Sequence, residues 1–309
     1  MIGFQYRNNN FTFYYRNIEY QLSNYNQYRI LYIFLKNYII CKKISLEFLK
    51  IIFLSSFQCI FLYRNETIYK LSFDQLTNLY EQYNVSVDNT YLGRTFSILP
   101  IYNIGYIVES EYIPYMLGFN IFLKLEGEPF IVFYSLTLDY LKAILFLHKK
   151  GYLHSSLKPI QYMVDNLGRG KIVGLENIIA IEANKTFYEN TGGSVKYLAP
   201  ERYRYFLQNG FFGMTSKASD TWELIYSILC SLDIINQDEF IDILKNNQDL
   251  LESYLLNHII NKFGLSWGSD IFGFVHNYCY VISKGLQYDI DQRWYIDKII
   301  LHLLGYKKS

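Results

Sequence analysis

The chain has 309 residues, of which 51% are hydrophobic and 18% charged, a composition typical of globular proteins and not of disordered ones. Its formal net charge of +1, with Lys and Arg dispersed along the sequence, gives no reason to expect binding to nucleic acid or anionic lipid through a strong overall field. The 32 tyrosines and 23 phenylalanines are what AT-rich codons encode, so they do not by themselves predict stacking on nucleic acid.

The cysteines and the apolar stretches indicate an intracellular setting. The four cysteines are far apart and form no C-x-x-C pair, which predicts neither a disulfide framework nor a zinc site. The first residues lack the pattern of a secretory signal, and the apolar stretch at residues 30–40 is shorter than the roughly 20 residues that a membrane span needs. We therefore expect a cytoplasmic protein without a membrane span.

In chain order, the sequence predicts an N-terminal extension, a small sheet and a helical region. The extension, residues 1–44, contains a predicted strand at 11–15 and a helix that begins after Asn24, but no signal for its role. A capping box at Ser72 and Gln75 predicts one helix that ends near residue 84. The predicted strands are residues 49–54, 59–63, 68–71, 95–101 and 105–109. The later predicted helices are residues 138–148, 224–232, 240–256, 274–286 and 296–304.

Five motifs in the second half of the chain occur in a recognisable order. Residues 147–159 read LHKKGYLHSSLKP, residues 171–176 read KIVGLE and residues 193–201 read GSVKYLAPE. Residues 219–224 read SDTWEL, and residues 291–293 read DQR. Together they resemble the catalytic loop, the metal-binding strand and turn, the end of the activation segment, the large-lobe helix and the late arginine motif of eukaryotic-type protein kinases.

This resemblance implies a fold and a division of the chain. It implies an α+β, bilobal kinase-like fold with a small β-rich N-lobe at residues 45–114 and a larger α-helical C-lobe at residues 115–309. The extension at residues 1–44 has no counterpart in the family.

The resemblance also implies that the reacting groups of a kinase are missing. Ser156 stands where the family has the aspartate that accepts the substrate proton, and a serine hydroxyl is no useful base near neutral pH. Gly174, which follows Ser156 by 18 residues, replaces the magnesium-binding aspartate, and Gln161 replaces the asparagine that is the second magnesium ligand. No metal site is expected. His154 and Lys158 are retained; we expect His154 to pack against the loop and Lys158 to be able to meet an anion.

The nucleotide-binding elements that the resemblance implies are degraded too. The loop at residues 55–60 lacks every glycine, so the side chains of Ser55 and Gln58 would crowd a phosphate. Lys70 aligns with the strand lysine that contacts phosphates; Glu81 is its candidate partner, unless both are ordinary surface residues. Glu111 and Ile113 lie in the hinge between the lobes, whose backbone would hold an adenine.

What the motifs retain is structural. In the family, the counterpart of Glu201 pairs with that of Arg293, and the counterpart of Asp220 holds the backbone of the catalytic loop. The resulting hypothesis is a catalytically inactive pseudokinase that binds a protein partner, such as an active kinase, in signalling. It requires no cofactor, leaves ATP open as a ligand and argues against magnesium. The alternatives are a divergent active Ser/Thr kinase that uses Glu176 or Asp165 for the metal, and a sensor that binds ATP without hydrolysing it.

Overall fold

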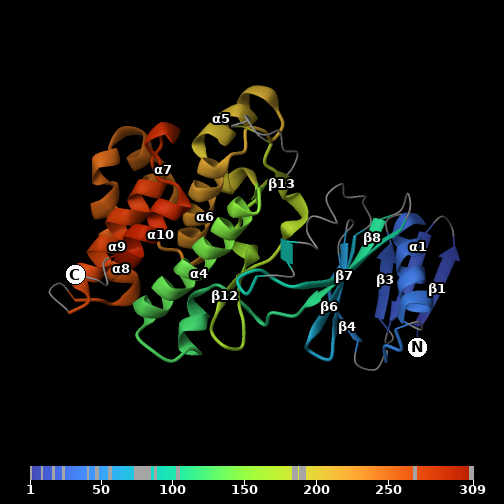
Figure 1. Ribbon diagram of the computed structural model, residues 1–309. Coiled ribbons are helices and arrows are strands. Elements are labelled where there is room, and N and C mark those ends of the chain that lie inside the picture. Colours follow the sequence, from blue (N-terminus) through green and yellow to red (C-terminus); the bar gives the residue numbers. More distant parts are fainter. Residues whose placement is uncertain are drawn as a thin grey trace. The chain divides into compact units, whose positions relative to one another are not determined.

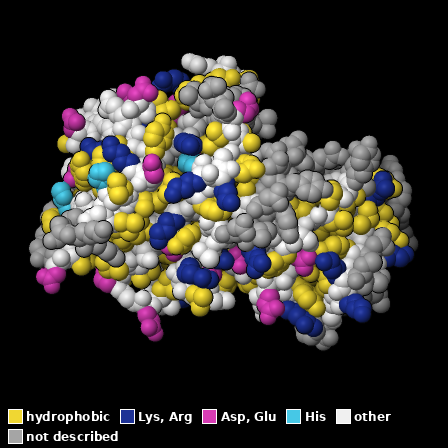
Figure 2. All heavy atoms as spheres, in the orientation of Figure 1, with side chains coloured by type: hydrophobic (Ala, Val, Ile, Leu, Met, Phe, Trp, Pro, Cys, Tyr) yellow, Lys and Arg dark blue, Asp and Glu magenta, His cyan; other side chains and the backbone are white. Residues whose placement is uncertain are grey.

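The protein has a mixed α+β structure made of two compact units (Figure 1). Unit 1 comprises Met1–Asp88 and Gly93–Tyr112, so the extension at residues 1–44 belongs to it; unit 2 comprises Asn89–Leu92 and Ile113–Ser309. On the face drawn in Figure 2, Lys and Arg side chains are spread among hydrophobic and acidic ones. The computed structural model describes residues 2–7, 10–15, 18–22, 25–39, 42–45, 49–54, 58–72, 85–86, 89–101, 105–182, 187, 193–266 and 270–305.

Unit 1 contains two antiparallel sheets. The first has the order β1-β2-β3, and only its central strand was predicted. The second has the order β4-β5-β6-β8-β7 and confirms all five predicted strands of the small sheet. The strands are β1 (Ile2–Arg7), β2 (Asn10–Tyr15), β3 (Ile18–Leu22), β4 (Leu49–Leu54), β5 (Gln58–Tyr63), β6 (Thr67–Ser72), β7 (Thr95–Ile101) and β8 (Gly105–Glu111).

One helix supplies the core between these sheets. Helix α1 (Tyr25–Ile33) continues directly into a π-helical segment, η1 (Phe34–Tyr38), which confirms the helix predicted after Asn24. The helix predicted to end near residue 84 falls on residues 73–84, outside the described part of the chain, as does Asn24 itself. The apolar residues of α1 and η1 share one cluster with both sheets: Phe13, Leu22, Ile30, Leu31, Phe34, Leu35, Ile39, Leu49, Cys59, Phe61, Tyr69, Leu71 and Ile107.

The register of the larger sheet fixes which side chains face this core. Tyr69 lies opposite Phe61, and both belong to the cluster with α1. Lys70 lies opposite Ile60 on β5 and Val108 on β8. Because successive side chains of a strand point to opposite faces, Lys70 lies on the face of the sheet away from α1.

Unit 2 is built around α4 (Pro129–Lys149). The Glu128 carboxylate caps this helix by accepting a hydrogen bond from the Ile131 amide at 2.8 Å, and Pro129 occupies the first turn. Among the described residues, α4 is the one helix long and apolar enough to cross a membrane, but 61% of its apolar window is buried inside the protein. Its hydrophobicity is therefore that of a core helix.

The remaining helices of unit 2 match the predictions in part: α5 was not predicted, α6 begins seven residues before its predicted start, and the helix predicted at residues 240–256 is divided. Instead of one helix at residues 240–256, α7 ends at Asn246 and α8 begins at Leu251, with a 3-10 turn at Gln248–Leu250. Consecutive amide side chains at this point favour a turn over a helix, and Asn247 leaves helical geometry with φ −142° and ψ 45°. The helices are α5 (Pro200–Asn209), α6 (Lys217–Ser231), α7 (Gln237–Asn246), α8 (Leu251–Phe263), α9 (Phe272–Gly285) and α10 (Ile296–Gly305).

Short strands complete unit 2 and place the loops. The order β12-β11-β9 joins β9 (Tyr115–Met116), β11 (Tyr162–Val164) and β12 (Gly170–Ile172). Strand β10 (Tyr152–Leu153) pairs with β13 (Ile179–Ala180). The segment between β10 and β11 is the stretch that resembles a catalytic loop.

The burial of Phe34 predicts that the N-terminal extension is an integral part of unit 1. Phe34 is fully buried, and its ring centroid lies 5.0 Å from that of Phe61 and 5.4 Å from that of Tyr69. We expect Phe34→Ala to lower the free energy of unfolding by about 3–5 kcal/mol in urea denaturation, because it leaves a cavity between helix and sheet. Phe96→Ala, at an exposed position of the same unit, should cost less than about 1 kcal/mol. Equal losses in both variants would contradict the packing.

Candidate functional site

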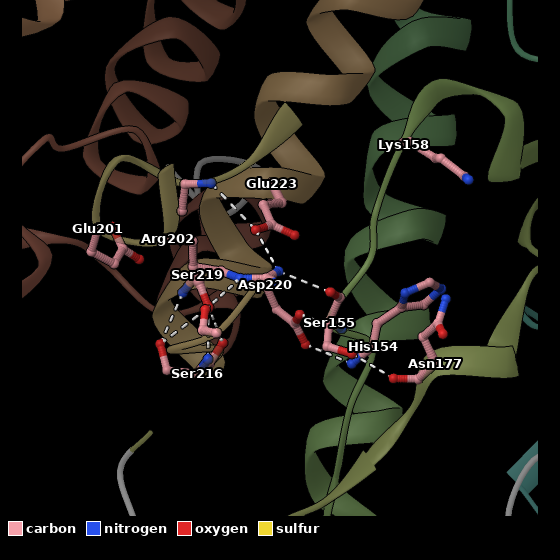
Figure 3. A network of polar contacts seen from close by, with 12 residues as sticks. His154, Ser155, Lys158, Asn177, Glu201, Arg202, Ser216, Ser219, Asp220 and Glu223 are labelled. Carbon is pink, nitrogen blue, oxygen red and sulfur yellow. Dashed lines mark hydrogen bonds and ion pairs between the residues drawn. The ribbon is translucent and has the colours of Figure 1, made fainter. Parts of the chain in front are cut away.

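The carboxylate of Asp220 holds the loop that contains His154. Ser216 caps α6, accepting from the Ser219 amide at 3.1 Å, and this places Asp220 in the first turn. The fully buried Asp220 accepts from the amides of His154 and Ser155, each at 2.8 Å, and its Oδ2 lies 3.0 Å from His148 Nε2 (Figure 3). One carboxylate therefore fixes two consecutive loop amides.

The charge states of this network follow from burial and pairing. Burial works to raise the pKa of Asp220, but the hydrogen bond from His148 and the nearby loop groups outweigh it and leave the pKa below its usual range. Burial lowers the pKa of His154 to about 4, against the opposing effect of Asp220. His154 is thus a neutral, fully buried side chain at pH 7 and not an exposed base.

Ser155 adopts a backbone conformation that its neighbours hold in place. Its φ of 62° lies in the left-handed region, which costs a non-glycine residue about 1 kcal/mol or more. Its amide is bound by Asp220, its Oγ donates to the Asn177 carbonyl oxygen at 2.5 Å and its own carbonyl oxygen accepts from Arg202 Nη1 at 2.8 Å. Three separate contacts therefore keep the loop in this form.

Arg202 connects the loop to α5 and α6. It is fully buried; its Nη1 also donates to Glu223 Oε1 at 2.8 Å, and its Nε donates to the Gly213 carbonyl oxygen at 3.2 Å. Glu223 Oε1 accepts from the Ala199 amide as well, at 3.3 Å. This buried pair clamps the end of the GSVKYLAPE segment against the loop.

Burial raises the pKa of the Glu223 carboxyl group. This burial brings the pKa of Glu223 to about 7, although the guanidinium of Arg202 works to lower it, and the neighbouring charge of Asp220 adds to the rise. The carboxyl group therefore titrates near neutral pH while it remains in contact with Arg202.

Gln161 and Gly174 meet at the two positions that the kinase resemblance assigns to metal ligands. The Gln161 Oε1 accepts from the Lys158 amide at 3.0 Å, and its Nε2 donates to the Gly174 carbonyl oxygen at 3.3 Å. Gly174 has φ 82°, and a Cβ added there would lie 2.7 Å from Gln161 Nε2. Ser156, five residues before Gln161, is buried. The Lys158 side chain points away from the Asp220 network (Figure 3).

The expected pair of Glu201 and Arg293 forms with two parallel bonds. Arg293 Nη1 donates to Glu201 Oε1 at 2.8 Å, and Nη2 donates to Oε2 at 3.0 Å. Further bonds from Arg293 to the carbonyl oxygens of Ala218 and Gln287, at 3.1 and 3.0 Å, link the start of α5 to α6 and the end of α9.

The nucleotide-binding candidates are divided between the two units. Lys70 and Gln58 lie half-buried on strands of unit 1, and Glu111 accepts from the Arg94 amide at 2.9 Å within that unit. Ile113 is buried in unit 2. Ser55 and Glu81 fall outside the described residues, so the expected pair of Lys70 with Glu81 stays a prediction.

The structure shows the surroundings of Asp165 and the position of Glu176, the two carboxylates considered for metal binding. Both oxygens of Asp165 are engaged in a turn, accepting from the Leu167 and Arg169 amides and from the Arg169 side chain, whose Nη2 lies 2.7 Å from Oδ2. Glu176 lies in a 3-10 turn after Gly174. In the described ranges, no three His, Cys, Asp or Glu side chains gather as metal ligands would.

Sequence reasoning missed the residues that complete the network. Arg202 directly follows the GSVKYLAPE motif, while Glu223 and His148 lie within the motifs at residues 219–224 and 147–159, but none of the three was assigned a partner. A signal for Glu223 was present: a lone carboxylate in the apolar run of α6 is buried, and a buried charge requires a partner. Nothing local to Arg202 indicated that it would be that partner.

Comparison with known proteins adds no family to this geometry. No family model matches the sequence, and no curated protein is similar enough to count as a relative.

The buried ion pair predicts a large and specific loss of stability. Arg202→Met leaves Glu223 buried without its cation, so we expect a loss of about 3–5 kcal/mol in urea denaturation. Arg204→Met, an exposed position on the same helix, should cost less than about 1 kcal/mol. A small loss for Arg202→Met would show that Glu223 does not depend on it.

The raised pKa of Glu223 predicts that the free energy of unfolding depends on pH. A carboxyl whose pKa rises from 4.5 to about 7 on folding takes up a proton, so its contribution lowers the free energy of unfolding as pH rises through that window. His154, with its lowered pKa, acts in the opposite direction, so wild type must be compared with Glu223→Gln. The stability of wild type relative to the variant should fall between pH 5 and 7.5. A constant difference would contradict the raised pKa.

Gly151, whose φ is nearly the same as that of Gly174, is the control for the clash that a side chain at position 174 would make with Gln161. Gly151 has φ 83° and no atom within 4 Å of an added Cβ, so Gly151→Ala should cost only the left-handed backbone, about 1–2 kcal/mol. Gly174→Ala adds the clash with Gln161 and should cost at least about 1 kcal/mol more by thermal or urea denaturation. Equal costs would mean that Gln161 does not fill this space.

Proposed function

We propose that this protein has the protein-kinase fold and acts as a pseudokinase, a catalytically inactive scaffold that binds a protein partner in the cytoplasm. Three features support the fold. A five-stranded antiparallel sheet precedes a mainly helical unit in the chain, Asp220 binds the loop amides after His154, and Glu201 pairs with Arg293. Each matches a role that the motif resemblance assigns.

The contact between Gln161 and Gly174 carries the proposal of inactivity. The Gln161 amide fills the space in which a side chain at position 174 would begin, and it binds backbone groups on both sides of that space. An uncharged bridge thus stands where phosphoryl transfer would need a carboxylate to hold magnesium and neutralise developing charge. Ser156 supplies no base to complete the reaction.

The alternative of a divergent active kinase requires a replacement metal ligand. Asp165 is already engaged by Arg169 and two turn amides, and the other candidate, Glu176, lies in the 3-10 turn after Gly174. A pseudokinase needs no such ligand, and ATP can remain open as a ligand that is bound without being consumed.

A phosphotransfer assay tests the proposal. Purified protein incubated with radiolabelled ATP, magnesium or manganese, and generic protein substrates should incorporate no phosphate above the level of a Lys70→Met variant. Phosphate transfer that depends on the metal and is abolished by Lys70→Met would refute the proposal. Thermal stabilisation by ATP only in the presence of metal would also favour the active-kinase alternative.

A further inference from the structure

The N-terminal extension differs sharply in charge from the rest of the chain. Residues 1–44 contain six Lys or Arg and one acidic residue, Glu19, a formal charge of +5. The other 23 basic and 27 acidic residues leave residues 45–309 at −4. The dispersal of Lys and Arg along the sequence therefore conceals a local excess of positive charge in one part of unit 1.

Two of these six basic residues, Arg29 and Lys36, lie on helix α1 and segment η1 beside a row of tyrosines. Tyr25, Tyr28 and Tyr32 lie one turn apart, with successive ring centroids 6.2 Å apart and interplanar angles of 15° and 14°. Arg29 lies over the ring of Tyr25 at 5.5 Å, and Lys36 Nζ donates to Tyr32 Oη at 2.7 Å. We call these five residues the tyrosine stripe.

The stripe lies at the surface. Tyr25 is 53% exposed, Arg29 and Lys36 are exposed, and Tyr28 and Tyr32 are half-buried. The segments Tyr25–Ile33 and Phe34–Tyr38 contain no acidic residue. Over the region where Figure 1 places α1, Figure 2 shows mainly hydrophobic side chains, with charged ones around them.

We propose that the tyrosine stripe is a docking surface for an acidic segment of a partner protein. Tyr and Arg are the residues that most often dominate binding at protein interfaces, and rings already held by stacking lose little entropy on binding. Two cations on a helix face without carboxylates complement an acidic chain. Lys42 is excluded from this role, since it lies 3.7 Å from Glu109 in a salt bridge.

The ring geometry favours an acidic polypeptide over single-stranded nucleic acid. Bases bind by stacking on an open aromatic face. Here the faces of Tyr28 are shared with its two neighbours, and Arg29 lies over Tyr25. Arg29 and Lys36 contact the tyrosine rings from the solvent-exposed side of the helix, and their positive charge suits the carboxylates of an acidic chain better than the face of a base.

This inference rests on the proposed role as a binding protein, but its test does not involve nucleotide. A fluorescein-labelled 12-residue peptide of glutamates with interspersed leucines and one tryptophan is titrated with the full chain, and binding is followed by anisotropy. We expect saturable binding that weakens with salt, and at least tenfold weaker binding by the Arg29→Glu/Lys36→Glu double variant. Tyr25→Ala should also weaken it severalfold.

The matched control replaces two basic residues by glutamate in unit 2, so the net charge changes by the same amount away from the tyrosine stripe. Lys149→Glu/Lys245→Glu, at exposed positions of unit 2, should bind the peptide within about twofold of wild type, and circular dichroism should show both double variants folded. No binding of the acidic peptide to wild type, or equal weakening by both double variants, would overturn the inference. Tighter binding of a 12-residue oligouridine would replace it with a nucleic-acid surface. Phosphotransfer by a chain that still bound the peptide would refute the pseudokinase proposal alone.

Discussion

The bonds made by the Asp220 carboxylate determine the shape of the site. A fully buried carboxylate is costly unless it is well paired, and Asp220 is satisfied by two backbone amides and His148. Its presence in the first turn of α6 depends on the Ser216 cap, and it directs the loop carbonyl of Ser155 toward Arg202. Helix, loop and the end of the GSVKYLAPE segment are thereby joined through one group.

This network holds the loop mainly through its backbone. Asp220 binds the amides of His154 and Ser155, and Arg202 binds the Ser155 carbonyl oxygen, so these contacts do not depend on the side chain at either position. The left-handed Ser155 stores strain, which the bonds from Asp220 and Arg202 offset. The loop is therefore held by contacts with its neighbours, and the Gln161 side chain bonds the Gly174 carbonyl oxygen beside it.

Much of the fold was predictable because its elements have clear periodic patterns. The five strands of the larger sheet and most helices of unit 2 follow apolar periodicity with turns at polar clusters. The break between α7 and α8 was missed because apolar spacing continues across Asn246 and Asn247. The packing of the N-terminal extension against the sheet depends on contacts between residues far apart in sequence, such as Phe34 with Phe61 and Tyr69, which no local pattern encodes.

The sequence predicted the residues of the candidate site that belong to a motif. It did not predict contacts between residues that lie far apart in the sequence. Glu201, Asp220 and Arg293 came from motifs, and each has the structural contacts expected of it. Arg202 and Glu223 are joined across 21 residues, and the fit of Gln161 against Gly174 depends on a backbone angle. Neither spacing nor composition contains that information.

Native-state hydrogen exchange of the His154 and Ser155 amides tests the central claim most directly. If a buried carboxylate network maintains the loop, both amides should already be strongly protected in the free protein, without magnesium or ATP, and should exchange only through global unfolding. Rapid exchange in the free protein, followed by strong protection when magnesium and ATP are added, would contradict this account. It would instead describe a loop that awaits its nucleotide.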